Sequence, residues 1–473
     1  MKFVFNQNAP VRVVFLWKDE EFTGHAGIEA LLADEVISGK RGEAYLLRGE
    51  QPVLALGLGK RACVTTDRLR EAFFKLGKKA DREHVKGLVI PVLAIEGLTT
   101  EAIYEAAAEG LLHSTYQYDA FKSEKKSLYL ETISFETANE TTVQQAVYQA
   151  QQYMQGIFTT RDLINEPAMY MTPTKLAVQA KEILQPLGVK VTVLEQEQIE
   201  ELGMHAFLAV AKGSAQPPKL IVMEYYGGAK DEKPLALVGK GLTYDSGGYC
   251  IKPPSGMETM NSDMGGAATV IGAMQVIALQ KLSKNVVAVI AACENMISGD
   301  AYKTGDIINS MAGKTIEIIN TDAEGRLTLA DAVHYTVTRF EPTALVDTAT
   351  LTGACLVALG ELYTALVSNN RAFAEEVLQA AEEADELVWQ LPSHSKFGKM
   401  NHSERADLKN SGGRFGGTIS AGLFVGEFVN KTPWVHLDIA GTAYLSKADG
   451  YLPKNGTGSI VKTMAKLAAL HQA

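Results

Sequence analysis

The chain is poor in the residues that build disulfide frameworks and zinc knuckles. It has only 4 cysteines among 473 residues, and the closest two, Cys250 and Cys293, are 43 positions apart. This spacing excludes a CxxC motif and a disulfide-rich scaffold, and it favours a reducing compartment. A His-Glu-x-x-His motif is also missing, and the 9 histidines are scattered along the chain. The sequence therefore gives no support to a histidine-bound zinc site.

Positive charge and long apolar runs are equally scarce. Lysine and arginine number 45 against 55 acidic residues, a formal net charge of −10, which argues against a dominant nucleic-acid or membrane-surface partner. No segment has the ~18 uninterrupted apolar residues of a membrane span. The first ten residues hold one lysine and a three-residue apolar run, so we expect no signal peptide and a cytoplasmic protein.

The composition that remains is that of a globular protein. Hydrophobic residues make up 46% and charged residues 21% of the chain, and its length suggests two or three domains. Up to about residue 140, strand-like runs alternate with amphipathic stretches, which predicts an α/β domain. The predicted strands cover 11–17, 53–58 and 85–94, and the predicted helices cover 67–79 and 101–112.

A single long helix is predicted next, over 140–163, from apolar residues at spacings of three and four. The second half carries near-continuous aliphatic runs, which are typical of strands buried on both faces of a sheet between helix layers. The runs lie at 220–226, 235–238, 286–291, 315–319, 344–348 and 435–439, and helices are predicted at 266–282, 327–340, 372–387, 420–430 and 458–471. Because ligands bind at the carboxyl ends of strands in such sheets, residues just after each run are candidate site residues.

Three groups of charged residues lie at or near such positions. In chain order they are Lys240, Asp245 and Lys252; Asp263; and Asp322, Glu324 and Arg326. Taken singly, each carboxylate has a simpler explanation as a turn residue, a helix cap or an ion-pair partner. Four carboxylates that converge without a histidine would, however, be costly unless a cation neutralised them. Oxygen-rich ligation of this kind suits hard or borderline divalent ions.

The sequence blocks around these charges carry a family resemblance. Gly239-Lys-Gly-Leu-Thr-Tyr-Asp-Ser-Gly-Gly, Asp263-Met-Gly-Gly-Ala-Ala and, above all, Asn320-Thr-Asp-Ala-Glu-Gly-Arg-Leu are similar to motifs of the cytosolic leucyl aminopeptidase family of two-metal exopeptidases. Supporting blocks are Arg161-Asp-Leu-Ile-Asn-Glu-Pro, Cys293-Glu-Asn-Met, Thr348-Ala-Thr-Leu-Thr-Gly and His436-Leu-Asp-Ile-Ala-Gly. The resemblance covers about residues 155 to 465. Departures from the family pattern, at Tyr249-Cys250, Ile297 and Lys303-Thr304, remove no expected ligand.

The resemblance implies a site for two divalent ions, Mn²⁺ or Zn²⁺, in each subunit. Both ions would share Asp245 and Glu324. One ion would add Lys240 and Asp263, and the other would add Asp322. Lysine can ligate a metal only as the neutral amine, so the resemblance implies a strongly lowered pKa for Lys240 in the metal-bound protein.

Catalytic and substrate-binding roles follow from the same resemblance. Lys252 would stay cationic and polarise the scissile carbonyl, while Arg326 would hold a bicarbonate ion that acts as general base. The substrates would be peptides with a free N-terminus, with Leu and other apolar residues preferred at the first position. The pocket for that first side chain would be lined by Met260, Thr350, Gly353 and Ala443.

The resemblance also implies the architecture and the assembly. We predict a smaller, macro-like N-terminal α/β domain over 1–140, a connecting helix over 141–165, and a C-terminal α/β/α catalytic domain with a mixed sheet over 166–473. A homohexamer is expected, with no membrane partner.

Other functions fit the sequence less well. Ser246 lacks the first glycine of a G-x-S-x-G elbow, and Gly313-Lys-Thr has Ile308 where a phosphate loop needs glycine. A two-metal phosphoesterase would need the same acidic cage, but the block from Asn320 to Arg326 matches the peptidase. An additional DNA-binding role, as in some bacterial members of the family, stays open through the lysines of 74–79 and 122–126, which neighbouring acidic residues dilute.

Overall fold

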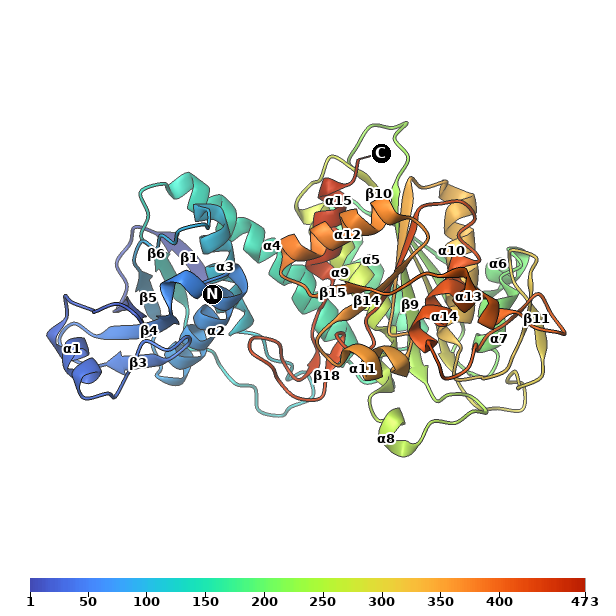
Figure 1. Ribbon diagram of the computed structural model, residues 1–473, viewed down its shortest axis with the longest axis horizontal. Helices are drawn as coiled ribbons and strands as arrows, with labels where there is room; N and C mark the ends of the chain where they lie inside the picture. Colours follow the sequence, from blue (N-terminus) through green and yellow to red (C-terminus); the bar gives the residue numbers. More distant parts are fainter. Residues whose placement is uncertain (473) are drawn as a thin grey trace. The chain divides into compact units, whose positions relative to one another are not determined.

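The computed structural model describes residues 1–472. The chain divides into two compact units, whose labelled elements are shown in Figure 1. Unit 1 contains Met1–Met154 and Ala448–Leu452, and unit 2 contains Gln155–Lys447 and the chain from Pro453 onward. Helix α4 (Glu140–Asn165) contains the division between Met154 and Gln155. Each unit has its own sheet and helices, so the prediction of a two-domain α/β chain is confirmed.

Unit 1 is built on a six-stranded sheet with the order β1-β6-β5-β2-β4-β3. Its strands are β1 (Lys2–Phe5), β2 (Val11–Trp17), β3 (Ala44–Leu47), β4 (Val53–Gly59), β5 (Gly87–Ile90) and β6 (Thr132–Phe135). Neighbouring strands are parallel except for β3, which is antiparallel to β4. The predicted strands correspond to β2, β4 and β5, whereas β1, β3 and β6, of four residues each, were not predicted. Strand β5 is equally short, but it lies within the longer apolar run 85–94 that the prediction used.

Three helices of unit 1 lie in the loops between its strands: α1 (Ala26–Ala33), α2 (Thr66–Arg82) and α3 (Thr100–His113). Helix α2 begins after Thr65, whose hydroxyl accepts the backbone N–H of Arg68 as a helix cap. Leu69, Phe73 and Leu76 follow at helical spacing and are buried in the unit's core. Helices α2 and α3 pack against each other.

Unit 2 is built on an eight-stranded mixed sheet, as predicted, with the order β15-β14-β17-β13-β9-β10-β8-β7. The strands are β7 (Lys190–Leu194), β8 (Lys219–Tyr226), β9 (Leu235–Asp245), β10 (Asn285–Asn295), β13 (Ala344–Ala349), β14 (Thr364–Ser368), β15 (Val388–Gln390) and β17 (Trp434–Asp438). The four central strands, from β17 to β10, are parallel. Strands β14 and β8 flank them and run antiparallel. The carboxyl ends of β9, β10, β13 and β17 therefore meet at one edge.

Helices cover both faces of this sheet (Figure 1). Helices α5 (Pro173–Leu184), α9 (Gly265–Leu279), α12 (Arg371–Ala384) and α15 (Val461–Leu470) pack on one face, and α7 (His205–Ala211), α10 (Gly325–Phe340) and α14 (Gly417–Gly426) pack on the other. The shorter helices are α6 (Gln196–Glu201), α8 (Pro254–Met257), α11 (Gly353–Leu359) and α13 (Ser395–Gly398).

Helix α9 is the central helix of unit 2. The stretch Pro254–Leu279, which includes α8 and α9, is long and apolar enough to cross a membrane, but 94% of its apolar window is buried inside the protein. The apolar character of this stretch is therefore that of a helix in the protein core. Small residues allow α9 to approach the sheet closely, because a side chain on Gly266 would overlap the carbonyl oxygen of Thr348 on β13.

The structure departs most from the prediction at residues 315–319, which were expected to form a strand of the main sheet. These residues form only β12 (Thr315–Glu317), which pairs with β11 (Ile307–Asn309) and β16 (Leu408–Lys409) in a separate three-stranded sheet. A further two-stranded sheet consists of β18 (Tyr444–Leu445) and β19 (Asn455–Gly456). The apolar run around β12 predicted burial correctly, since Ile316 and Ile318 lie in the core, but a run of this kind does not specify which strand becomes its partner.

Candidate metal centre

Strand β9 supplies two charged side chains to the interior of unit 2. Lys240 lies within the strand and its side chain is only 3% exposed, while Asp245 is the last residue of the strand. A lysine ammonium at this depth requires partners, because burial of an unpaired charge is very costly. The ammonium nitrogen of Lys240 lies 2.8 Å from Oδ1 of Asp263 and 2.9 Å from Oε1 of Glu324, and it donates to the carbonyl of Thr350 at 3.0 Å.

Asp263 lies in a 3₁₀ turn (Met260–Met264) that leads into α9. The sequence allowed it to be the cap of that helix, but the cap position is occupied by Met264, and no side-chain cap bond forms there among the residues described. The carboxylate of Asp263 instead accepts from Lys240 and, at 2.8 Å, from the hydroxyl of Thr350. Asp263 therefore faces Lys240 in the middle of β9.

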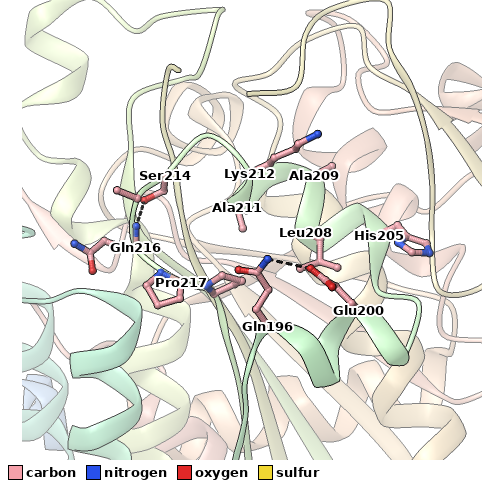
Figure 2. Close-up of a pocket in the computed structure, with 12 residues that line it drawn as sticks. Gln196, Glu200, His205, Leu208, Ala209, Ala211, Lys212, Ser214, Gln216 and Pro217 are labelled. Carbon is pink, nitrogen blue, oxygen red and sulfur yellow. Dashed lines mark hydrogen bonds between the residues drawn. The ribbon is translucent and has the colours of Figure 1, made fainter. Parts of the chain in front are cut away.

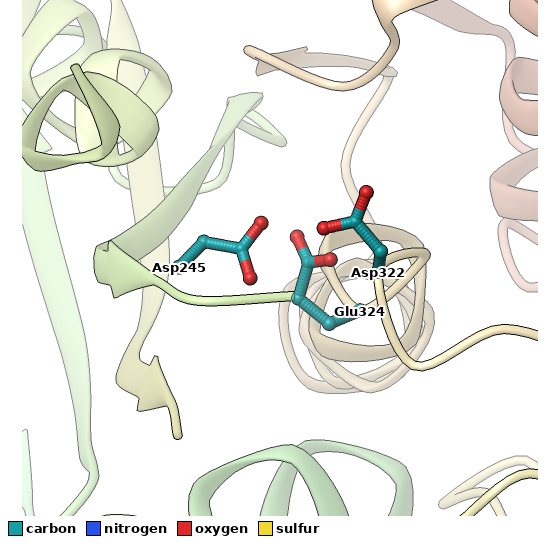
Figure 3. A group of neighbouring side chains, drawn as sticks. All are labelled: Asp245, Asp322 and Glu324. Atoms are coloured by element: carbon teal, nitrogen blue, oxygen red, sulfur yellow. The ribbon is translucent and has the colours of Figure 1, made fainter. Parts of the chain in front are cut away.

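Asp322 and Glu324 lie in the loop between β12 and α10, and Glu324 directly precedes the first residue of that helix. Their carboxylates point toward that of Asp245 (Figure 3). One carboxylate oxygen from each of the three residues lies within 4.8 Å of the other two, which is close enough to ligate a common ion. The loop needs glycine at position 325, because a side chain there would overlap Lys240.

Lys252 contacts two carboxylates of the cluster that Lys240 does not bind. Its ammonium nitrogen is 2.9 Å from Oδ2 of Asp245 and 2.5 Å from Oδ1 of Asp322, and its side chain is 16% exposed. The four carboxylates and two lysines leave two formal negative charges in excess. Unlike Lys240, Lys252 lies beside the partly exposed Asp322. It is thus positioned to meet a substrate group that arrives from solvent.

The environment shifts the pKa of each carboxyl group in the cluster. Burial, followed by the charge of Glu324, raises the pKa of Asp263 to about 8 against the opposing effect of Lys240. Burial and Glu324 likewise raise the pKa of Asp322 to about 6 and raise that of Asp245. For Glu324 burial is outweighed by Lys240 and Lys252, so its pKa is lowered. The carboxylates as a group therefore repel one another, and additional positive charge would stabilise them.

The carboxylate oxygens of the cluster offer free lone pairs that are suited to a divalent cation. Oε2 of Glu324 is buried and accepts no hydrogen bond from any residue in 1–472. Such an atom is expensive to bury unless something else satisfies it. It belongs to the group of three carboxylates that converge on one point. An oxygen-rich set of this kind, with an excess of negative charge, matches the preferences of divalent ions such as Mn²⁺ and Zn²⁺.

Arg326 lies in the first turn of α10, next to Glu324. One guanidinium nitrogen, Nη1, donates to the carbonyl of Asn410 at 2.8 Å, while the buried Nε has no acceptor among the residues described. Burial lowers the pKa of Arg326 to about 10, against the raising effects of Glu324 and Asp438. The group is a cation at neutral pH with unused donor capacity, which suits a small anion.

The predicted pocket residues are placed as follows. Thr350 and Ala443 lie side by side, since a side chain on Gly265 would contact Thr350 at 3.2 Å and Ala443 at 3.3 Å. Met260 shares the 3₁₀ turn of Asp263. Gly353 begins α11, and a side chain there would have no neighbour within 4 Å in the described chain. Thr350 joins this group to the metal cluster through its bond to Asp263.

Two buried asparagines at this site were missed by sequence reasoning. Asn295 ends β10 and donates to Asp245, and Asn410 follows β16 and holds the loop before Glu324. The amide oxygen of Asn410 accepts the N–H groups of Ile319 and Asn320, at 2.8 and 3.2 Å. A signal existed for Asn295, which follows Cys293-Glu in a block already noted and lies at the carboxyl end of a predicted strand. None existed for Asn410.

A separate surface pocket of about 500 Å³ lies among α6, α7 and the segment before β8 (Figure 2). Its 12 lining residues include none of the charged residues of the metal cluster. Three polar members of its lining, Glu200, His205 and Lys212, are exposed to solvent. A catalytic pocket usually holds polar groups that converge and are shielded from water, so the metal cluster is the better candidate site.

Comparison with known proteins agrees with this geometry. The profile of the cytosol aminopeptidase family, catalytic domain, matches residues 158–465, and that of the same family's N-terminal domain matches residues 13–125. Two relatives named probable cytosol aminopeptidase, from Clostridium tetani and Treponema denticola, are each 48% identical to the chain. The alignment covers 99% of both chains in the first case and 98% of both in the second.

Solved structures show the same fold over nearly the whole chain. The bottromycin maturation enzyme BotP in complex with Mn has a TM-score of 0.89 and 30% identity, covering 98% of this chain and 99% of its own. A tomato leucine aminopeptidase mutant has a TM-score of 0.89 and 31% identity, covering 99% of this chain and 97% of its own. The chain therefore belongs to the cytosol aminopeptidase family and is a metal-dependent aminopeptidase, a peptidase that uses divalent metal cofactors.

Proposed function

We propose that the chain releases N-terminal amino acids, preferentially Leu and other apolar residues, by a two-metal, bicarbonate-assisted hydrolysis. Lys240, Asp245, Asp263, Asp322 and Glu324 would hold the two ions. The single observation that carries this proposal is the convergence of carboxylates from β9 and the β12–α10 loop around the unsatisfied Oε2 of Glu324. The manganese complex of BotP, a structural relative, supports Mn²⁺ as one of the metals.

The two ions, when bound, supply Lewis-acid polarisation of the scissile carbonyl and lower the pKa of the attacking water. Lys252 remains protonated, because Asp245 and the other carboxylates raise its pKa in spite of burial. Its ammonium stabilises the negative charge that develops on the carbonyl oxygen in the transition state. Lys252 can do so without moving far, since its nitrogen already lies between Asp245 and Asp322.

Lys240, unlike Lys252, must lose its proton in order to act as a metal ligand. With protein groups alone, burial disfavours its charge, but Asp263, Glu324 and Asp245 outweigh burial and raise its pKa. A dication held by the same carboxylates would compete for their attraction and repel the ammonium, so that Lys240 would give up its proton and offer a nitrogen lone pair. The two lysines, at similar distances from carboxylates, thus take different protonation states when the ions are bound.

Arg326 would hold a bicarbonate ion through the donor capacity that Asn410 leaves unused. A bicarbonate bound there would supply the general base, a role that Arg326 cannot fill because its guanidinium stays protonated. The first substrate residue lies against Met260, Thr350, Gly353 and Ala443. The open space at Gly353 and the small side chain of Ala443 leave room for an apolar side chain of the size of Leu.

The organisation of the chain completes the proposal. We assign residues 1–140 to an N-terminal domain, 141–165 to a connecting helix and 166–473 to the catalytic domain, in a homohexamer located in the cytoplasm. The names of the relatives support this location. Unit 1 gives little support to an additional DNA-binding role, because Lys75, Lys79 and Lys126 are paired with carboxylates at 2.7, 2.8 and 3.0 Å. A gel-shift assay that shows no binding of DNA at low ionic strength would eliminate that role.

Release of leucine from a peptide with N-terminal Leu tests the proposal. The purified protein is assayed as isolated, after treatment with a chelator, and after addition of Mn²⁺ or Zn²⁺, each with and without bicarbonate. We expect the chelator to abolish release and either metal to restore it, with a faster rate when bicarbonate is present. Release that a chelator does not affect would refute the two-metal mechanism, and equal rates without bicarbonate would refute the role of Arg326.

A further inference from the structure

Asn295 joins two segments that carry metal-cluster residues. It is the last residue of β10, it is fully buried, and it lies opposite Asp245 in the parallel register of β10 and β9. Its amide nitrogen donates to Oδ1 of Asp245 at 2.8 Å and to the backbone carbonyl of Thr321 at 2.9 Å. Thr321 directly precedes Asp322. One side chain thus connects the end of β9 with the loop that carries Asp322 and Glu324.

The orientation of this amide is fixed by its partners. Both groups that it contacts are oxygen acceptors, so the NH₂ group must face them. Oδ1 of Asn295 then points toward Gly248 and receives no hydrogen bond from any residue in the described chain. A fully buried acceptor without a donor lowers stability, so stability alone does not explain an asparagine at this position.

The carbonyl that Asn295 contacts is itself held in place. The hydroxyl of Tyr302 also donates to the carbonyl of Thr321, at 2.8 Å. The hydroxyl of Thr321 donates to the carbonyl of Gly247 at 2.7 Å and accepts the N–H of Cys250 at 2.8 Å. Hydrogen bonds of Thr321 therefore hold the loop after β9 against the loop before α10. Because Asn295 bonds to both Thr321 and Asp245, it fixes the position of the Asp245 carboxylate relative to these loops.

We propose that Asn295 is a positioning residue for the metal centre. Its amide holds Oδ1 of Asp245 together with the backbone N–H of Gly247, which donates to the same oxygen at 2.9 Å. These two bonds fix the rotation of the carboxylate and keep Oδ2 directed toward the cluster, where Lys252 lies 2.9 Å away. The amide of Asn295 also sets the separation between Asp245 and the loop of Asp322 and Glu324. Asn295 thereby raises the affinity of the site for divalent ions, although it ligates none itself. This inference rests on the metal ligands assigned under the proposed function.

The test compares Asn295→Leu with Asn401→Leu. Asn401 is a matched control, because it is buried in the same unit, donates to one backbone carbonyl, that of Ser420 at 2.8 Å, and also has an amide oxygen without a donor in the range described. Mn²⁺ affinity is measured by calorimetric titration of the metal-free proteins, and thermal unfolding is followed on the same samples. We expect Mn²⁺ to bind Asn295→Leu roughly 10–100-fold more weakly than the wild type, and Asn401→Leu as tightly as the wild type.

The unfolding measurement separates positioning from a structural role. If Asn295 is a positioning residue, the metal-free Asn295→Leu protein should unfold at a temperature close to that of metal-free Asn401→Leu. The loss of Mn²⁺ affinity is then specific to the metal centre. Wild-type Mn²⁺ affinity in Asn295→Leu, or an equal loss in both variants, would overturn the inference. If the wild-type protein bound no Mn²⁺, the metal centre itself would fail and the inference with it. If Asn295→Leu does not fold, Asn295→Ala is measured against Asn401→Ala with the same criteria.

Discussion

Replacement of Lys252 by methionine separates metal binding from catalysis. Methionine retains much of the length of the side chain but removes the ammonium that lies 2.9 Å from Asp245 and 2.5 Å from Asp322. If this cation stabilises the transition state as an oxyanion donor does, its loss should lower kcat by about 10²–10³-fold, or roughly 2.7–4 kcal/mol. The mutation also removes a positive charge that competes with metal ions for two carboxylates. Mn²⁺ should therefore bind the variant at least as tightly as the wild type.

The assay measures kcat for release of leucine and Mn²⁺ affinity on the same preparations. The control is Lys284→Met, which removes an ammonium that, among residues 1–472, donates only to the carbonyl of His471, at 2.7 Å in the same unit, and should leave both quantities unchanged. A value of kcat within threefold of the wild type would refute the catalytic role of Lys252. A parallel fall in kcat and Mn²⁺ affinity would show instead that Lys252 acts by holding the carboxylates in place.

Three further predictions concern the loop after β9, pH and specificity. Gly247→Ala should lower stability by about 1–3 kcal/mol and weaken Mn²⁺ binding, because position 247 has φ +85° and its Cβ would lie 2.8 Å from Oδ1 of Asp322; Gly305→Ala, with φ +90° and open space within 4 Å of the described chain, should show the strain alone. Burial raises the pKa of Asp331 from 3.8 to about 7, so its contribution to folding is fully present below about pH 4 and lost as the pH rises through 7. The stability of Asp331→Asn, measured by denaturant unfolding in saturating Mn²⁺, should fall less steeply between pH 5 and 8 than that of the wild type, and an equal slope would contradict the assignment. Ala443→Val should lower kcat/KM for N-terminal Leu relative to N-terminal Ala by about 10-fold, and an unchanged ratio would exclude Ala443 from the pocket.

Local sequence patterns predicted most of the secondary structure that positions the site. The apolar runs that became β9, β10, β13 and β17 were recognisable because strands buried on both faces need continuous aliphatic residues. Three members of the main sheet, β7 (Lys190–Leu194), β14 (Thr364–Ser368) and β15 (Val388–Gln390), were not predicted. They are five, five and three residues long, and β7 alternates exposed and buried positions, so none has the long buried run by which the central strands were recognised.

The short strand β12 shows where such patterns stop being informative. Its apolar residues predicted burial, but the strand lies in a small separate sheet, and Asp322 and Glu324 reach the cluster through a loop rather than from the main sheet. That loop is held by Asn410, about 90 positions further along the chain. A contact over such a distance leaves no periodic trace in the sequence.

The sequence by itself determined which residue types were available for the chemistry and in which local order. The block from Asn320 to Leu327 and the one from Gly239 to Gly248 identified the family resemblance, and the absence of clustered cysteine and histidine directed attention to carboxylates. Only the tertiary structure decided that the carboxylates of Asp245, Asp322 and Glu324 converge, that Lys240 joins Asp263 to Glu324, that Oε2 of Glu324 is left without a donor in 1–472, and that Asn295 joins the two loops. The physical reason is that sequence patterns report burial and backbone preference over a few residues, whereas the distances in a metal centre depend on how segments tens of positions apart pack together.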